Sequence, residues 1–350
     1  EGTDCTITCR EDKEATGVQA YESGCAVLSR SSVSNATFGF IGLTSASLEL
    51  KGCATTNTGK AVTIDSATGT ITDCTLFGKS VGIYCLHAGT CTATNVTIEH
   101  LRFGVETAGG GSTVTINGGT IKRVDGGDTE DRGIFVRDGA KLNASHCAIT
   151  GRAEGSSAGV RVESRATVKL CNSSTTKTAF SYTAITSSKL ELQDCIATRT
   201  SNGITVDGAT GTMADCSLKA KSVGIFCLHK GTCTVTNTAI EHQRHGVEVA
   251  SEGELTARGV TISFEGEGPE NIGIHAHTKG TADVEDFTVS SEVLIEHRSA
   301  ASCETGATLH LRNGTIAPHC YDYGLVCEGT GKLSAEDVTA RPAASAASRG

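Results

Sequence analysis

Residues 79–106 read KSVGIYCLHAGTCTATNVTIEHLRFGVE, and residues 221–248 repeat them as KSVGIFCLHKGTCTVTNTAIEHQRHGVE. The two stretches lie 142 residues apart and are identical at 21 of 28 positions. The same offset aligns residues 38–53 with residues 180–195 without a gap. A repeat of this length decides the architecture first, because repeated units bury their apolar faces by stacking on one another.

A shorter period of about 20 to 30 residues lies inside the long one, and about fourteen copies can be drawn between Gly17 and Ala340. Within each copy, apolar and polar residues alternate as in a strand with one buried face. Gly, Ser, Thr, Asn and Asp separate these strands and favour tight turns. Only residues 10–16 hint at a helix. The pattern predicts an all-β solenoid whose rungs stack about 4.8 Å apart, in a rod roughly 65 Å long.

The sequence resembles the right-handed parallel β-helix of the pectin-lyase-like superfamily, over about nine-tenths of the chain. Gly-apolar pairs begin the rungs and apolar pairs close them: Gly82 and Ile83, Gly133 and Ile134, Gly159 and Val160, Gly203 and Ile204, Gly324 and Leu325, then Cys74 and Leu76, Cys147 and Ile149, Cys216 and Leu218. The resemblance implies a right-handed parallel β-helix of about fourteen rungs with a seven-rung duplication. It does not specify an activity, because enzymes, adhesins and intracellular scaffolds share this fold.

The repeat predicts the domain organisation. We expect an N-terminal cap over residues 1–16 and one β-helix domain over 17–340. The domain would contain superrepeats at about 17–158 and 159–300 and a partial third at 301–340. Residues 341–350 read as a tail or linker, with end-to-end association or further domains beyond it. Because the chain begins at Glu1 without Met, we expect a processed product or a fragment of a longer protein.

Composition excludes some classes of function. The net charge is −9, from 30 basic and 39 acidic residues, and no basic stripe is visible, which argues against nucleic-acid binding. No run of eighteen apolar residues occurs, so no membrane span is expected. Aromatic residues make up 4% of the chain and Trp is absent, so stacking platforms for sugars are scarce. The signature runs of pectin hydrolases, alginate epimerases and calcium pectate lyases are also missing.

Sixteen cysteines favour an oxidising compartment. Twelve occupy equivalent or flanking positions and are disulfide candidates: Cys5, Cys9, Cys53, Cys74, Cys85, Cys91, Cys195, Cys216, Cys227, Cys233, Cys303 and Cys327. A ladder of reduced, buried cysteines is the alternative. A zinc site on Cys85, His87 and Cys91 lacks a fourth ligand, so no metal is expected there. Five sequons are glycosylation candidates and also favour an extracellular or cell-surface protein: Asn35, Asn95, Asn143, Asn172 and Asn313.

The duplicated window also contains the residues best suited to chemistry. Its candidates for catalysis are Glu99, His100 and Arg102 with their copies Glu241, His242 and Arg244. A carboxylate, an imidazole and a cation of this kind could serve a lyase or epimerase acting on an acidic polysaccharide. They could equally bind a ligand or turn the corner of a rung. His87 and His229 are candidate binding residues, and we expect His87 not to reach Glu99 or His100.

Two acidic loops interrupt the repeat at residues 125–131 and 265–270. Asp125, Asp128, Glu130 and Asp131 offer oxygen ligands that suit Ca²⁺, but their spacing fits no known calcium loop, so solvated loops and no cofactor are the simpler interpretation.

The sequence therefore favours a non-catalytic extracellular scaffold that presents repeated surfaces to a protein or glycan partner. A polysaccharide lyase or epimerase is the first alternative. The second is an intracellular substrate-recognition adaptor, which would require reduced cysteines.

Overall fold

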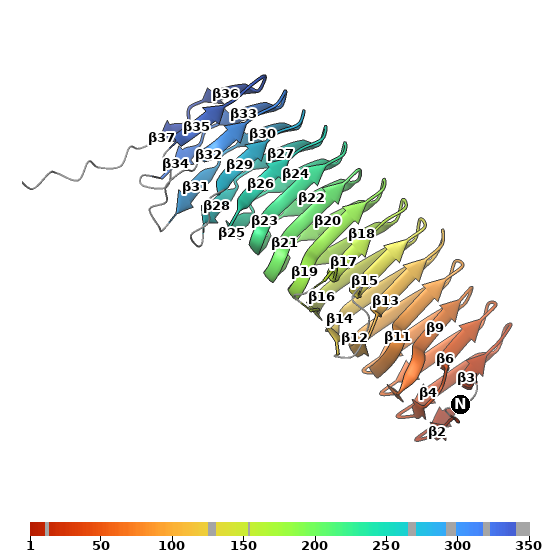
Figure 1. Cartoon of the computed structure of the whole chain (residues 1–350). Coiled ribbons are helices and arrows are strands. Elements are labelled where there is room, and N and C mark those ends of the chain that lie inside the picture. The colour runs from red at the N-terminus through yellow and green to blue at the C-terminus, as the bar shows by residue number, and fades with distance from the viewer. Residues whose placement is uncertain are drawn as a thin grey trace, which may run out of the picture. The chain divides into compact units, whose positions relative to one another are not determined.

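The computed structural model describes residues 1–10, 14–124, 131–152, 155–264, 271–291, 299–317 and 323–340. These residues form strands β1 to β37 and contain no helix (Figure 1). The chain divides into two compact units, Glu1–Glu191 and Leu192–Gly350, which are described separately. Each unit is a solenoid in which every rung contributes one strand segment to each of three parallel sheets.

Unit 1 winds through eight rungs. Sheet 1 contains β3 (Thr16–Ala20), β6 (Phe38–Leu43), β9 (Thr58–Asp65), the second half of β11 (Thr75–Leu86), β13 (Phe103–Ala108), β15 (Arg132–Arg137), β17 (Ala158–Val162) and the second half of β19 (Ser174–Ile185). Sheet 2 contains β1 (Gly2–Thr3), β4 (Cys25–Ser29), β7 (Ser47–Lys51), β10 (Thr68–Thr72), the first halves of β12 (Thr90–His100), β14 (Thr113–Arg123) and β16 (Lys141–Thr150), and β18 (Thr167–Cys171). Sheet 3 contains β2 (Thr6–Thr8), β5 (Ser32–Ser34), β8 (Ala54–Thr56) and the remaining halves of the long strands.

Unit 2 repeats the plan over six rungs, with β20 (Lys189–Gln193) containing the boundary between the units. Sheet 1 contains the second halves of β21 (Ile196–Asp207) and β23 (Ser217–Leu228), then β26 (His245–Val249), β29 (Ile272–Ala276), β32 (Ser299–Cys303) and β35 (Tyr323–Cys327). Sheet 2 contains β22 (Thr210–Ala214), β24 (Thr232–Thr236), β27 (Glu254–Arg258), β30 (Thr281–Glu285), β33 (Thr308–Arg312) and β36 (Lys332–Glu336). Sheet 3 contains the first halves of β21 and β23, then β25 (Ala239–His242), β28 (Thr261–Phe264), β31 (Thr288–Ser291), β34 (Thr315–Ile316) and β37 (Thr339–Ala340).

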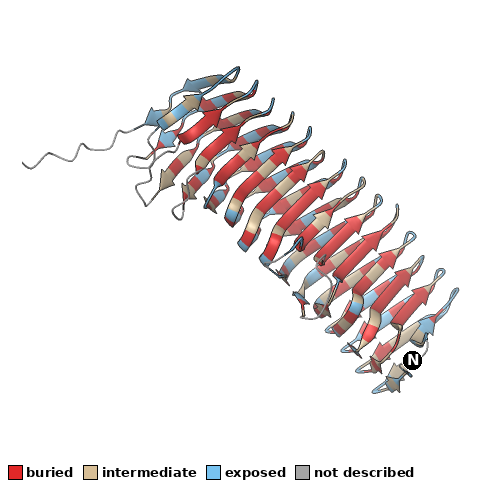
Figure 2. Cartoon of the chain, viewed as in Figure 1, coloured by how far each residue is buried: buried red, intermediate tan, exposed pale blue. Residues whose placement is uncertain are grey.

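Alternation of side chains builds the core. In β7, Leu48 and Leu50 are buried, whereas Ser47, Glu49 and Lys51, which alternate with them, are exposed. Figure 2 shows that other strands, such as β13 and β32, are buried along their whole length. Because the rungs pair in parallel and in register, like residues stack into columns. The predicted all-β parallel solenoid of about fourteen rungs is confirmed.

Close packing at the start of each sheet 1 strand explains the repeated glycine. A Cβ on Gly82 would lie 2.3 Å from Ile98 Cγ2 and 2.5 Å from the carbonyl oxygen of Gly104. Real Cβ atoms do not approach other atoms so closely, so any larger residue would displace the neighbouring rung.

Asn and Asp make the bend between sheets 2 and 3. Asp73 and Asn95 both have φ near +50°, the left-handed conformation that these short polar residues tolerate. Asn95 Nδ2 donates a hydrogen bond to Asp73 Oδ1 at 3.3 Å, and Asn237 donates to Asp215 at 3.2 Å in unit 2. The bend therefore explains why asparagine occurs at position 95 without invoking glycosylation. Glycosylation of Asn95 stays a prediction.

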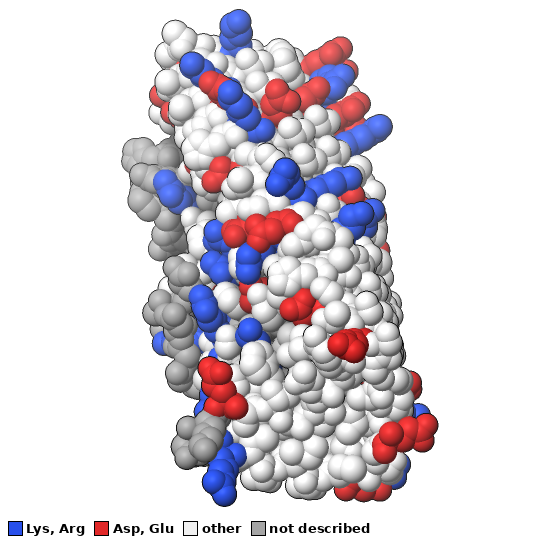
Figure 3. Space-filling model, turned by 90° about the vertical axis from the view of Figure 1, so that its right-hand side faces the viewer, with Lys and Arg blue, Asp and Glu red and all other residues white. Residues whose placement is uncertain are grey.

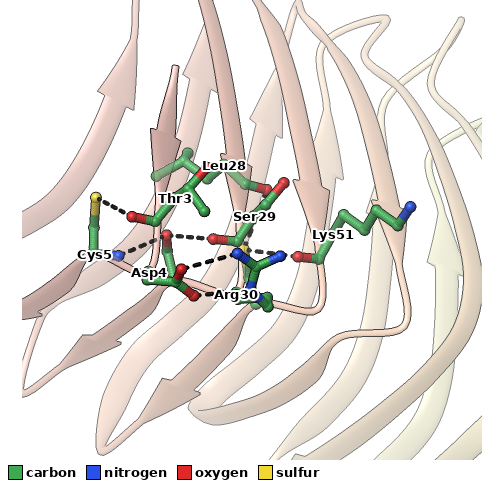
Figure 4. A network of polar contacts seen from close by, with 9 residues as sticks. Thr3, Asp4, Cys5, Leu28, Ser29, Arg30 and Lys51 are labelled. Carbon is green, nitrogen blue, oxygen red and sulfur yellow. Dashed lines mark hydrogen bonds and ion pairs between the residues drawn. The ribbon is translucent and has the colours of Figure 1, made fainter.

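The N-terminal residues already belong to the solenoid. β1 and β2, within the stretch for which a cap is predicted, pair in parallel with β4 and β5. The turn after β1 is tied to the next rung, because Arg30 Nε and Nη2 donate to the two carboxylate oxygens of Asp4 at 2.8 and 2.9 Å (Figure 4). This ion pair is exposed, so it positions the turn more than it stabilises the core.

Candidate functional site

The duplicated histidines His87 and His229 lie in exposed turns between sheets 1 and 2. His87 Nδ1 lies 2.8 Å from Asp65 Oδ1, and His229 Nδ1 lies 2.8 Å from Asp207 Oδ1. Each aspartate ends the strand of the preceding rung and is in register with the residue just before its histidine. The two copies therefore preserve the same surface pair.

His100 and His242 point into the core instead. Each is only 1% exposed, and the ring of His242 contacts that of Phe264 with centroids 4.2 Å apart. Burial and, to a smaller extent, the positive charge of Arg123 lower the pKa of His100, the backbone of Arg102 partly offsets both, and the resulting pKa is about 3. Burial likewise lowers the pKa of His242 to about 3. Both rings are neutral near pH 7 and are out of reach of a polymer on the surface.

The acidic and basic candidates beside these histidines stay near the surface. Glu99 and Glu241 are partly exposed, and Glu241 pairs with Lys219 at 2.6 Å. Arg102 and Arg244 are exposed, and the Arg102 guanidinium lies 4.7 Å from the centroid of the Phe103 ring. The structure therefore separates each histidine from the surface groups next to it, and does not assemble the three as acid, base and cation on one face.

None of the fifteen cysteines in the described residues forms a disulfide, including all twelve candidates. The stacking expected of Cys53 and Cys74 is present, since both are buried and the Cys53 backbone N–H donates to Cys74 Sγ at 3.3 Å. Cys303 and Cys327 are also in register, although Cys327 on the last described rung is exposed. Burial raises the pKa of Cys85 to about 12, so its thiol stays protonated. This geometry matches the alternative of a reduced, buried ladder.

In unit 1, the outer face of sheet 1 carries cations stacked over aromatic rings. Phe103 and Phe135 contact each other with centroids 5.4 Å apart and pack with Val81 and Tyr84. The Arg132 guanidinium lies 4.4 Å from the Phe135 centroid and 5.4 Å from that of Phe103.

Lys60 and Arg137 extend this arrangement to the neighbouring strands. Lys60 Nζ lies 4.5 Å from the centroid of Tyr84 and 5.2 Å from that of Phe38. Arg137 lies 5.9 Å from the Phe135 centroid and donates two hydrogen bonds to Glu106 Oε1, at 3.1 and 3.0 Å. We call Lys60, Arg102, Arg132 and Arg137, with the rings beneath them, the cation–aromatic ladder.

The equivalent face of unit 2 carries histidines. His245 Nδ1 lies 2.7 Å from Glu248 Oε2, and His277 Nε2 lies 3.1 Å from Glu248 Oε1. His275 Nε2 lies 3.2 Å from Glu304 Oε1. The imidazole rings of His245 and His275 meet edge to face with centroids 5.0 Å apart, and those of His275 and His277 stack at 4.5 Å. We call these five residues the histidine cluster.

Burial gives the histidine cluster unusual electrostatics. Burial would raise the pKa of Glu248, but the hydrogen bonds from His245 and His277 outweigh it and hold that pKa below its ordinary value. Burial, followed by the charges of His245 and His277, lowers the pKa of His275 to about 4, and the carboxylates of Glu304 and Glu248 only partly offset this. His275 is therefore a neutral imidazole near pH 7.

The two faces are equivalent positions of the duplication. Glu106 is in register with Phe135, and Glu248 is in register with His275. The offset of 142 residues that relates Phe103 to His245 also relates Glu106 to Glu248. Sequence reasoning missed the histidine cluster because its members come from three rungs. The available signal was His at the start of one rung (residues 245–248) and His-Ala-His in the next (residues 275–277).

The calcium candidates are only partly described. Asp125, Asp128 and Glu130 lie outside the described residues, so calcium binding stays a prediction. Asp131 is buried and lies 2.6 Å from Arg123 Nη1, with both side chains 2% exposed. A buried ion pair already uses this carboxylate, which makes it a poor cation ligand.

Comparison with known proteins agrees with the fold. Residues 60–218 match a family described as "Right handed beta helix region". The match covers somewhat less than half of the chain, and together with the parallel rungs it agrees with the right-handed parallel β-helix fold that the Gly-apolar pairs predict, without indicating a particular member. No curated protein sequence matches the chain. Among the described residues, no helix is long and apolar enough to cross a membrane.

Several solved structures are similar to this chain at low identity. The A-module of the mannuronan C-5 epimerase AlgE4 from Azotobacter vinelandii is 12% identical, covers 71% of this chain and 91% of its own, and gives a TM-score of 0.39. The periplasmic alginate epimerase AlgG is 8% identical, with 93% and 78% covered and a TM-score of 0.42. A PL6 alginate lyase in complex with a trisaccharide is 10% identical, with 94% and 91% covered and a TM-score of 0.28.

Proposed function

We propose that this protein is an extracellular or cell-surface β-helix scaffold that binds an acidic glycan on the cation–aromatic ladder of unit 1. The observation that carries the proposal is the stacking of Lys60, Arg102, Arg132 and Arg137 over aromatic rings on the outer face of one sheet. The five sequons support the extracellular location, which stays a prediction. The cysteines of the described residues are unbonded and add no support for it.

The ladder has the chemistry that an acidic polymer requires. Guanidinium groups recognise carboxylate and sulfate groups through paired N–H donors. Stacking on a ring restricts each cation before the ligand arrives, which reduces the entropy lost on binding. Lys60 is on β9 and Arg102 directly precedes β13, two strands further on, so about 10 Å separates them along the stack, and Arg132 on β15 is about 4.8 Å beyond. An extended chain of charged sugars that crosses the strands can therefore meet these cations in turn.

Binding at the ladder is a local property, because the protein as a whole is acidic. Figure 3 shows basic and acidic side chains mixed on one face of the molecule, without a broad surface of one sign. Glu106 and Asp138 both pair with Arg137 and fix its position. A short, specific contact with an acidic glycan fits this pattern better than the long electrostatic contact of a nucleic acid.

Binding fits the site better than catalysis does. A lyase or epimerase needs a general base within reach of the sugar and a group that stabilises the developing negative charge. His100 and His242 are buried away from the surface. At the ladder itself, the carboxylate of Glu106 is 9% exposed and is held by Arg137, which leaves it poorly placed to accept a proton.

The test is the affinity of the intact chain for polygalacturonate and alginate, with neutral dextran as the control ligand. We expect binding that weakens with salt, because it depends on charge. The double variant Lys60→Gln, Arg102→Gln should bind about tenfold more weakly, an effect of about 1.4 kcal/mol. The matched control is Lys141→Gln, an exposed lysine on sheet 2 of the same unit.

Two results would overturn this proposal. One is equal affinity of the double variant and the wild type for the acidic polymers, with both proteins folded by circular dichroism. The other is new ultraviolet absorbance from unsaturated sugars on incubation with either polymer, which would establish a lyase.

A further inference from the structure

The histidine cluster on unit 2 brings together three side chains that bind metals in other proteins. His245 is on β26, Glu248 follows it by three residues on the same strand, and His275 is on β29, the next strand of sheet 1. One ligand atom from each residue lies within 4.8 Å of those from the other two. The three residues are buried or partly buried, unlike the acidic groups that are common on protein surfaces.

We propose that His245, Glu248 and His275 form a binding site for a divalent transition metal, with Zn²⁺ as the best match. Two imidazole nitrogens and one carboxylate oxygen are a common set of zinc ligands, with bonds of about 2.0 to 2.2 Å. Ligand atoms around a tetrahedral zinc ion lie about 3.4 Å apart at those bond lengths. The ligand atoms, which lie within 4.8 Å of one another, are therefore at most about 1.4 Å farther apart than this geometry requires. The inference is independent of glycan binding on unit 1.

The surroundings of His275 support its role as a ligand. Its Nε2 lies 3.2 Å from Glu304 Oε1, and Ser302 Oγ donates to the same oxygen at 3.0 Å. His275 is 9% exposed, and its Nδ1 is buried without a hydrogen-bond partner in the described part of the chain. If Nε2 carries the proton and donates it to Glu304, the lone pair of Nδ1 remains for a metal. A carboxylate that orients a histidine in this way is the usual second partner of metal-bound imidazole.

His277 positions the carboxylate from the other side. Its Nε2 lies 3.1 Å from Glu248 Oε1, whereas His245 Nδ1 contacts the other oxygen. A metal would enter between Glu248 Oε2 and His245 Nδ1, so the proton that these atoms share must pass to water as the metal binds. Three protein ligands leave the fourth position of a tetrahedral ion open to water or to a ligand group.

The duplication supplies a built-in comparison. In unit 1, Phe103 stands where unit 2 has His245, and Phe135 stands where it has His275. Glu106, the copy of Glu248, is paired with Arg137, whose guanidinium cannot lose its proton at ordinary pH. The same backbone positions therefore retain one possible ligand in unit 1, and that one is neutralised by a permanent cation.

The experiment measures Zn²⁺ binding to the intact, metal-stripped chain by equilibrium dialysis, and Co²⁺ binding by its visible absorption. We expect one tight site per chain and a rise in melting temperature on adding Zn²⁺, because a ligand of the folded state stabilises it. His275→Phe and His245→Phe each introduce the residue found in unit 1. Each should weaken zinc affinity by about 100-fold or more and remove the thermal shift. Glu106→Gln should change neither measurement.

Glu248→Gln covers the case in which a histidine variant fails to fold, because it keeps the size and shape of the side chain. It should also abolish the tight site. The proposal is wrong if the wild type binds no stoichiometric Zn²⁺. It is also wrong if a folded His245→Phe, His275→Phe or Glu248→Gln protein retains wild-type affinity, since the metal would then bind elsewhere, for example at the exposed His87 and Asp65 pair.

Discussion

Replacing His100 with Leu should remove a pH-dependent loss of stability. The imidazole is 1% exposed, and burial lowers its pKa to about 3 from the ordinary value of about 6.5. In unit 2, Phe264 occupies the register position that corresponds to Arg123 beside His100, so an apolar side chain is compatible with this level of the core. Leu keeps the volume and the apolar contacts but cannot take up a proton.

The sign and size of the effect follow from the two pKa values. The unfolded chain binds a proton at His100 below about pH 6.5, whereas the folded chain does so only near pH 3, so acid favours unfolding throughout that window. The stability that His100 contributes is complete above pH 6.5 and is lost as the pH falls. Between pH 7 and pH 5 the loss is about 2 kcal/mol, and at pH 4 it reaches about 3 kcal/mol.

Urea unfolding monitored by circular dichroism at pH 7 and pH 5 measures the effect as a difference between variant and wild type. His100→Leu should lose about 2 kcal/mol less than the wild type over this interval. His146→Leu is the matched control, because His146 is exposed on the surface of unit 1 and should leave the pH dependence unchanged. An identical pH dependence for wild type and His100→Leu would refute the reasoning, because it would mean that His100 is protonated as easily in the folded chain as in the unfolded one.

Two further predictions concern packing and charge in unit 1. Gly82→Ala should lower the free energy of unfolding by about 1 to 3 kcal/mol, because its Cβ would overlap the next rung. The control Gly110→Ala places its Cβ in open space and should have little effect. Similar melting temperatures for the two variants would contradict the packing argument. Asp131→Asn should cost about 3 to 5 kcal/mol in urea unfolding, because it removes the negative charge that lies 2.6 Å from the buried Arg123 guanidinium. Asp4→Asn breaks an exposed ion pair and should cost far less, so equal losses would show that burial does not decide the effect.

The fold could be predicted from the sequence because its determinants are local and periodic. Alternation around Leu48 and Leu50 defines a strand face within five residues. Gly82 marks the close approach of two rungs, and Asn95 marks a left-handed bend. Each signal returns once per rung, so a strand that is wrongly assigned in one rung can be corrected by comparison with the next rung. The stacking of Cys53 on Cys74 follows from the same periodicity, whereas bond formation does not, since register alone does not determine how two sulfur atoms are oriented.

The histidine cluster could not be predicted in the same way because its contacts join separate rungs. His245 and His275 meet only once the register of β26 and β29 is known. The insertion at residues 265–270 lies between them and changes the number of residues in that rung. The offset of 142 that relates His245 to Phe103 becomes 140 for His275 and Phe135, so alignment of the copies at one fixed spacing does not pair them.

The near-identity of the two 28-residue windows has a physical explanation that differs from a shared active site. The identical residues Cys85, Cys91 and His100 are each at most 1% exposed, as are their copies Cys227, Cys233 and His242.

Inside a close-packed solenoid, any change of volume must be accommodated by the rungs on both sides, so the interior changes least after a duplication. The outer face of sheet 1 has no such constraint, and there the copies differ, with Phe103 in one and His245 in the other. Burial of Cys85, Cys91 and His100 therefore accounts for part of the identity, and the exposed pair of His87 with Asp65 is preserved as well. The positions of Phe103 and His245 on sheet 1 are where the two copies carry different chemistry.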